Sequence, residues 1–342
     1  MKVNILSNKI SWFGKYSGYE CLVDYFSDNI DIELTIPNDK LLCRGIGKIL
    51  QSLKGWNKIR PAEIFAEFKF ANRSRKAQVS HILYLESHIH SLKLIRNNKN
   101  LVGTIHLPFN QWKTKNLDML YKLDKAIILY TKEISQFERY IDKSKIYFIR
   151  HGIDTVFFKP DLNETINRNK ILFIGHYLRD FKMFMDVYNL ITNDKTRNIE
   201  FHFIIPSTFR HLPDIQTITR FPNTFFHEGL SDAELLRFYQ TSYLLLMPME
   251  DSGANTAIVQ AISTGLPVVT TDVGGIRSYG GGEVFPIVSE KDIVGMAQLF
   301  EKYYHNEEFR MQISRLQRKF ALEQLDWRNI SQKHEEVYKA NI

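Results

Sequence analysis

Short apolar runs of strand length recur along this chain of 342 residues, and stretches long enough to form a helix separate them. Such alternation is typical of a parallel sheet with helices on both faces. The runs fall into two series, residues 3–6, 32–36, 82–86, 101–105, 126–130 and 146–149, and then residues 171–175, 200–205, 224–228, 243–247 and 267–271. Two series predict an α/β protein with two doubly wound, Rossmann-like domains.

The segment between the two series, residues 150–170, is polar and rich in turn-forming residues, which makes it the best candidate for a linker. We therefore expect a first domain over residues 1–155 and a second over residues 156–325. The remaining C-terminal segment reads as helix, broken near His305 and near Asp326. We expect the final helix, residues 326–342, to cross back to the first domain.

Positive charge is concentrated in the first half of the chain. Residues 1–150 hold 25 Lys and Arg against 14 Asp and Glu, whereas residues 151–342 hold 20 against 24. In residues 48–78 the basic side chains alternate with Trp56, Phe65 and Phe68. This pattern predicts an anionic partner, either a membrane surface or, less favoured, nucleic acid. A solvated basic helix whose aromatic face belongs to the core is the alternative.

Cysteine content and hydropathy indicate the compartment. Cys21 and Cys43 are the two cysteines of the chain, in no metal-like spacing, and the N-terminus lacks the apolar stretch of a signal peptide. No window approaches the roughly 20 apolar residues of a membrane span. We expect a cytoplasmic protein whose membrane attachment, if any, is peripheral and on the inner face.

Residues 250–275, EDSGANTAIVQAISTGLPVVTTDVGG, combine a helix, a turn and a buried strand. Apolar residues at helical spacing predict a helix over about residues 253–264, with Asp251 and Ser252 as N-caps. Gly265 and a following proline end this helix. The β-branched run that comes next is typical of a parallel strand covered on both faces.

Several other nucleotide and metal signatures are missing. The chain has no GxxxxGK[ST] motif, and GIGKIL (residues 45–50) has Leu50 where the third glycine of GxGxxG would stand. His88 and His90 have no third ligand nearby in sequence, so we expect no metal site there. These absences disfavour an ATPase and a simple dinucleotide-binding protein.

Segments that follow one another in order resemble the C-terminal half of GT-B glycosyltransferases of the large retaining group 1 family. They are residues 146–161, 171–182, 225–248 and 253–275, and the first half of the chain matches mainly at residues 14–26 and 102–109. The resemblance implies two doubly wound domains facing a central cleft. In that family the C-terminal domain holds a sugar nucleotide and the N-terminal domain holds the acceptor.

The resemblance also implies the site residues. His106 and Lys182 would support catalysis, with Lys182 neutralising the leaving diphosphate beside the free amides of a helix start. Donor contacts would come from Gly14, Lys15, Gly18, His176, Arg179, Glu250, Asp251, Ser252, Gly253, Ala254, Asn255, Thr256 and Gln260. Asp272, Gly274 and Gly275 would shape the loop over the donor.

Two positions depart from the Glu-x7-Glu pattern of the family. Ser252 stands where the first glutamate would contact the donor sugar, and Gln260 stands where the second would hold the ribose hydroxyls. A neutral amide makes weaker hydrogen bonds than a carboxylate. A small loop shift could bring in the carboxylate of Glu250 or Asp251 instead.

The activity implied by the resemblance is that of a hexosyltransferase-type glycosyltransferase. It would move a sugar from a uridine or guanosine diphosphate sugar to a glycan or lipid-linked glycan, with retention of anomeric configuration. It would need no metal and no cofactor beyond the donor substrate. Two alternatives remain: a DNA-modifying glucosyltransferase, and a catalytically altered GT-B scaffold that partners an active transferase.

Overall fold

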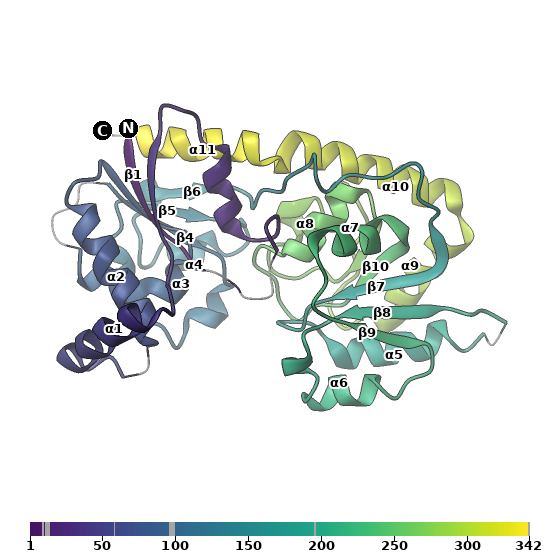
Figure 1. Ribbon diagram of the computed structural model, residues 1–342. Helices are drawn as coiled ribbons and strands as arrows, with labels where there is room; N and C mark the ends of the chain where they lie inside the picture. The colour runs from purple at the N-terminus through teal and green to yellow at the C-terminus, as the bar shows by residue number, and fades with distance from the viewer. Residues whose placement is uncertain (9, 11–13, 58, 96–99, 195, 341–342) are drawn as a thin grey trace. The chain divides into compact units, whose positions relative to one another are not determined.

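The computed structural model describes residues 1–8, 10, 14–57, 59–95, 100–194 and 196–340, and the chain divides into two compact units (Figure 1). Unit 1 is formed by the described residues within 1–13, 18–149 and 330–342. Unit 2 is formed by those within 14–17 and 150–329. The main boundary between the two units therefore lies between Ile149 and Arg150. The short N-terminal segment 14–17 also belongs to unit 2.

Unit 1 is built on a six-stranded parallel sheet with the order β2-β1-β3-β4-β5-β6. Its strands are β1 (Lys2–Leu6), β2 (Asp31–Thr35), β3 (Val79–Ile82), β4 (Leu101–Ile105), β5 (Lys125–Ile128) and β6 (Ile146–Phe148). Its helices include α1 (Leu41–Lys54), α2 (Pro61–Ser74), α3 (Leu85–His88) and α4 (Ile134–Phe137). Short 3-10 turns cover Tyr19–Tyr25, Ile89–Lys93, Phe109–Trp112, Leu117–Lys122 and Lys143–Lys145.

Unit 2 is built on a five-stranded parallel sheet with the order β11-β10-β7-β8-β9. Its strands are β7 (Asn167–Ile174), β8 (Glu200–Ile204), β9 (Thr224–His227), β10 (Ser242–Met247) and β11 (Val268–Thr270). Its helices include α5 (Phe181–Ile191), α6 (Pro213–Ile218), α7 (Asp232–Thr241), α8 (Thr256–Thr264), α9 (Ile293–His305) and α10 (Glu307–Phe320). Short 3-10 turns cover Ser207–Phe209 and Ile276–Tyr279. Every residue of β10, an interior strand between β11 and β7, is buried, as expected for a strand covered on both faces.

The predicted strands are observed in both sheets, but the third run of the first series is misplaced. We expected a strand over residues 82–86, whereas β3 ends at Ile82 and residues 85–88 form the short helix α3. Leu83 still donates its amide to Leu6 at 2.9 Å before the chain turns. Ile82, Leu83 and Leu85 are all fully buried, so an apolar run alone does not distinguish the end of a strand from the start of a buried helix.

The predicted breaks in the C-terminal helices are confirmed. α9 ends at His305, and a π-helical turn, Ala321–Leu325, separates α10 from the last helix, α11 (Trp327–Lys339). The first residues of α11 belong to unit 2, and the helix belongs to unit 1 from Ile330 onward. In unit 1 the Glu335 carboxylate accepts hydrogen bonds from the amide and hydroxyl of Ser27, at 2.8 and 3.1 Å.

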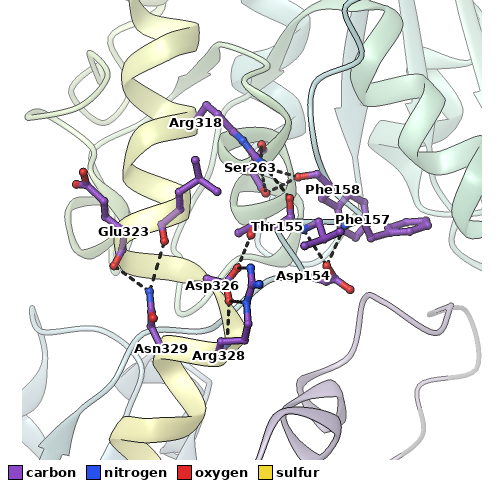
Figure 2. A network of polar contacts seen from close by, with 12 residues as sticks. Asp154, Thr155, Phe157, Phe158, Ser263, Arg318, Glu323, Asp326, Arg328 and Asn329 are labelled. Atoms are coloured by element: carbon purple, nitrogen blue, oxygen red, sulfur yellow. Dashed lines mark hydrogen bonds and ion pairs between the residues drawn. The ribbon is translucent and has the colours of Figure 1, made fainter.

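A polar network in unit 2 joins the segment after the division to the end of α10 (Figure 2). Asp326 accepts hydrogen bonds from the Thr155 hydroxyl and from the Arg328 guanidinium, whose Nε lies at 2.7 Å. Arg318 donates to the carbonyl oxygens of Thr155 and Ser263, at 2.9 and 2.7 Å. These contacts hold the segment that follows Arg150 against the segment that ends at Asn329, within unit 2.

Asp326 is the buried acceptor of this network, with 4% of its surface exposed. Burial alone would raise the pKa of Asp326, but the hydrogen bonds from Arg328 and Thr155 outweigh that effect and hold the pKa below its ordinary value. The network therefore stabilises the fold above the ordinary aspartate pKa. That stabilisation is lost as the pH falls through the lowered value.

We predict that Asp326→Ala lowers the free energy of unfolding by about 2–4 kcal/mol, because it leaves buried donors without an acceptor. The Arg328 side chain is 60% exposed, so Arg328→Ala should cost less than about 1 kcal/mol. Urea denaturation at neutral pH measures both values. Equal effects of the two substitutions would contradict this assignment of the buried acceptor.

Candidate functional site

The order of the strands in unit 2 reverses at β7. β8 and β9 extend the sheet on one side of β7, while β10 and β11 extend it on the other. In doubly wound sheets, ligands bind at the carboxyl ends of the strands at such a reversal. The segments that follow β7 and β10, residues 175–182 and 248–256, lie at this point and contain most of the predicted site residues.

Backbone hydrogen bonds join these two segments. The Glu250 amide donates to the carbonyl oxygen of Leu178, and the Asp180 amide donates to that of Pro248, both at 3.0 Å. Leu178 adopts a left-handed conformation with φ 59°, which is unusual for a branched side chain and is sustained by this pairing. The segment after β7 is therefore held against the segment after β10.

The Arg179 side chain stabilises the turn after β7 through hydrogen bonds to its backbone. Its guanidinium donates to the carbonyl oxygens of Ile174 and Tyr177, at 3.0 and 2.7 Å. Burial lowers the pKa of Arg179 to about 10, which leaves the group cationic at neutral pH. A fixed positive charge therefore lies directly after β7.

His176 and Lys182 lie on either side of Arg179 in sequence. The His176 ring stacks on Phe209 with 3.4 Å between ring centroids, and burial together with Arg179 lowers its pKa to about 4. Lys182 lies in the first turn of α5, is exposed, and forms no ion pair with any residue that the structure describes. His176 is thus neutral at pH 7, and Lys182 is available to an anion.

The start of α8 differs from the prediction. We expected Asp251 and Ser252 to cap a helix from about residue 253, but the N-cap is Asn255, whose side chain accepts from the Ile258 amide at 3.3 Å. The reason is that the Ser252 carbonyl accepts from Gly275 at 2.6 Å, which holds the preceding residues in a loop. The Ser252 hydroxyl is turned to the carbonyl of Gly253, at 3.1 Å.

Free backbone donors are left at this helix start. The amides of residues 253–257 donate no hydrogen bond within the described chain, and Ala254 and Thr256 are partly exposed. Unengaged amides at the positive end of a helix dipole form a favourable environment for an anion. Gly253, Ala254, Asn255 and Thr256, all predicted donor contacts, belong to this group.

A loop after β11 packs against residues 251–252. Gly274 has φ 46°, and a Cβ there would overlap the Ser252 carbonyl oxygen, so a glycine is required. The Asp272 carboxylate pairs with Arg277 rather than with the α8 start, its Oδ2 lying 2.6 Å from Nη2. The predicted loop residues Asp272, Gly274 and Gly275 therefore act through backbone fit and a local ion pair.

The carboxylates that could replace the missing glutamate occupy two environments. Asp251 Oδ1 accepts from the Ser252 amide at 2.8 Å, so this side chain is engaged locally. Glu250 is exposed, and burial of part of the group together with Asp180 and Asp214 raises its pKa. Glu250 is the freer of the two carboxylates.

Gln260 is buried in unit 2, with 3% of its surface exposed. Its Oε1 accepts from the Tyr239 hydroxyl at 2.8 Å, and its Nε2 donates to the Ser17 hydroxyl at 3.0 Å. The amide is thus held at both ends. Neither Tyr239 nor Ser17 was recognised from the sequence. No distinctive spacing marks a tyrosine on a helix or a serine in a turn-like segment as a partner of Gln260.

The N-terminal segment 14–17 explains how Ser17 reaches Gln260. The Lys15 amide donates to Asp232 Oδ2 at 2.8 Å, and a Cβ on Gly14 would overlap the same carboxylate. Tyr16 stacks on Phe157 with 3.9 Å between ring centroids. The predicted residues Gly14 and Lys15 therefore lie in unit 2, whereas Gly18 is the first residue of the following segment of unit 1.

His106 lies in unit 1, directly after β4. Its Nε2 donates to the Leu83 carbonyl at 2.6 Å, and its ring stacks on Tyr84 at 4.6 Å. Its amide lies 3.4 Å from the carboxylate of Glu86, whose pKa burial raises to about 7. Sequence reasoning missed Glu86, although an acid that ends an apolar run is a recognisable signal for a buried carboxylate.

Two negative findings concern the described parts of the chain. Within them, no group of three or more His, Cys, Asp or Glu is arranged to hold a metal ion. No helix there has the length and apolarity that a membrane span requires.

Comparisons with known proteins address the family and the fold. Residues 168–306 match the family model for "Glycosyl transferases group 1", and no curated protein matches the chain. HepE from Anabaena, solved with UDP-glucose, is 12% identical with a TM-score of 0.72, and the similarity covers 98% of each chain. Sucrose-phosphate synthase from Thermosynechococcus elongatus is 12% identical with a TM-score of 0.70, again over 98% of each chain.

A third similar structure is a longer protein. A variant of S. aureus TarM in complex with fondaparinux, alpha-GlcNAc-glycerol and UDP is 13% identical with a TM-score of 0.65. The similarity covers 82% of this chain but only 60% of TarM. The chain has the GT-B fold of two doubly wound domains, and residues 168–306, which lie in unit 2, are similar to the family described as glycosyl transferases group 1.

Proposed function

We propose that the protein is a glycosyltransferase that uses a nucleotide-diphosphate sugar as donor and binds the nucleotide on unit 2. The observation that carries this proposal is the α8 start, where the amides of residues 253–257 are unengaged at the reversal of the strand order. Lys182, exposed at the start of α5, adds a basic side chain that forms no ion pair with the described residues. A diphosphate needs such donors and cations.

The structural neighbours support the choice of donor class. HepE was solved with UDP-glucose, and TarM was solved with UDP. We extend this chemistry to the present chain as a proposal, with UDP as the favoured nucleotide and GDP as the comparison. The acceptor class that we propose is a glycan or a lipid-linked glycan.

In the proposed reaction the bond between the anomeric carbon and the diphosphate oxygen breaks, and a bond from the oxygen of an acceptor hydroxyl forms with retention of configuration. The proton of that hydroxyl leaves with the released nucleotide diphosphate. Negative charge accumulates on the departing diphosphate. Lys182, Arg179 and the α8 amides would stabilise that charge without a metal ion.

We predict that Lys182→Ala weakens UDP binding by about 1.5–3 kcal/mol, the range for a hydrogen bond that involves a charged group. Lys159→Ala, which removes another exposed lysine of unit 2, is the matched control and should leave the affinity unchanged. Isothermal titration with UDP and GDP measures both variants. An unchanged affinity in Lys182→Ala would exclude this lysine from the site.

We also propose that Gln260 contacts the ribose where the family uses glutamate, by exchanging its hydrogen bond to Tyr239 or Ser17 for one to a ribose hydroxyl. Gln260→Ala should then weaken the binding of UDP by about 0.5–1.5 kcal/mol, the range for a neutral hydrogen bond. The same substitution should leave the binding of the dideoxyribose analogue of UDP unchanged. Gln260→Glu should bind UDP as well or more tightly, because a carboxylate accepts stronger hydrogen bonds. An equal loss for both nucleotides in Gln260→Ala would mean that the contact is purely structural.

Metal independence is tested by assaying release of UDP from UDP-glucose in the presence of EDTA. The expected result is an unchanged rate, because protein cations and amides take the place of the metal. A rate that falls with EDTA and returns with Mg²⁺ or Mn²⁺ would contradict the proposal. UDP binding without any turnover over a panel of glycan acceptors would favour the scaffold alternative.

A further inference from the structure

Helix α1 lies beside α2 in unit 1 (Figure 1). It exposes several large aliphatic side chains. Leu42, Ile49 and Leu53 are 74%, 63% and 75% exposed, and Ile46 is 36% exposed. These four residues, which we call the α1 apolar face, follow i, i+4, i+7 and i+11 spacing and therefore form one stripe. Single exposed aliphatics are common on proteins, but a continuous stripe indicates a contact surface.

The packing of α1 explains why this face points away from unit 1. Gly47 is the one buried residue in the helix, and a Cβ there would overlap the backbone of Pro61 at the start of α2. Cys43 and Leu50, on the same side as Gly47, are partly buried. Because the close approach requires a glycine, the helix cannot rotate to bury its apolar face against α2.

The charge of α1 is entirely positive. The helix contains no acidic residue, and Arg44, Lys48 and Lys54, which we call the α1 cations, are exposed. None of them forms an ion pair with a residue that the structure describes. An apolar stripe on one side of a helix, with cations on its other sides that pair with no described residue, is the pattern of a helix that lies in an anionic membrane interface.

The aromatic residues that the sequence suggested for such a role are engaged elsewhere. Trp56, Phe65 and Phe68 are each partly buried. Trp56 packs within unit 1 against Phe68 and His90, with ring centroids 6.4 and 5.5 Å away. The most exposed apolar side chains of this basic region therefore lie on α1.

We infer that α1 docks the protein on an anionic lipid bilayer, with its apolar face in the interface and its cations against the headgroups. The helix has 14 residues, fewer than the roughly 20 needed to span a bilayer, so it would lie in the plane of the interface. A second copy of the chain is a poorer occupant, because two such helices would bring like charges together. Nucleic acid would leave the apolar face uncovered.

This surface deepens the proposed function. The protein would bind a lipid-linked acceptor at the membrane on which α1 docks. This role of the docking surface rests on the proposed glycosyl transfer. The docking itself does not depend on it, so lipid binding and UDP binding are measured separately on the full chain.

Sedimentation with vesicles tests the inference, using phosphatidylcholine mixed with phosphatidylglycerol and phosphatidylcholine alone. We expect binding to the anionic vesicles at about 0.15 M salt, where exposed charges are screened beyond roughly 8 Å. Replacing the three most exposed residues of the apolar face (Leu42→Gln, Ile49→Gln, Leu53→Gln) should weaken it by at least roughly 100-fold. Glutamine preserves helix propensity, so α1 should remain folded.

Replacing the three α1 cations by glutamine should also weaken binding by roughly 100-fold, because each basic residue contributes about 1 kcal/mol near an anionic surface. Leu162→Gln is the matched control, since Leu162 is 97% exposed in unit 2 and should not affect binding. UDP titration and thermal unfolding of each variant verify that the fold and the proposed donor site are intact.

The outcomes separate the possible occupants. Anionic vesicle binding that both triple variants lose and Leu162→Gln retains supports docking of α1. No binding to either vesicle overturns it. Self-association that only the apolar triple variant abolishes, measured by sedimentation equilibrium, would also overturn it. Tight binding of duplex DNA without vesicle binding would overturn it as well. If the wild-type chain does not bind UDP, the proposed function is refuted, but the conclusion on lipid binding is unaffected.

Discussion

The candidate site depends on the hydrogen bonds that join the segments after β7 and β10. Glu250 donates to Leu178 and Asp180 donates to Pro248, so two loops from strands on either side of the reversal become one rigid element. The loop after β11 adds a third side, because the Gly275 amide binds the Ser252 carbonyl. Together these contacts place the start of α8 at Thr256 and leave the amides of residues 253–257 without a partner among the residues that the structure describes.

That arrangement has an electrostatic consequence. The Arg179 guanidinium donates to carbonyl oxygens of the turn after β7 and stays cationic at neutral pH, and the Lys182 side chain is exposed. The neutral His176 adds no further positive charge at pH 7. The attraction for an anion thus comes from two cations and a helix end, each fixed by backbone geometry. Preorganised donors of this kind stabilise developing charge without having to reorganise.

Much of the fold could be predicted from the sequence, because the strands and helices leave a periodic pattern of apolar residues. Buried runs such as residues 243–247 and the helix stop at Gly265 leave local signals, and the two-sheet fold follows from their alternation. The α8 start could not be predicted, since Ser252 and Asn255 are both good caps and only the tertiary bond from Gly275 decides between them. The partners of Gln260 come from distant segments, so spacing carries no signal for them.

Hydrogen exchange, measured by mass spectrometry with and without UDP, tests the central claim most directly. The amides of residues 253–257 have no partner within the described chain and should exchange rapidly in the free protein. The account predicts that UDP slows exchange there and in residues 176–182, with no change in α1. Unchanged exchange at residues 253–257 under saturating UDP, or protection confined to unit 1, would contradict a nucleotide site at the start of α8.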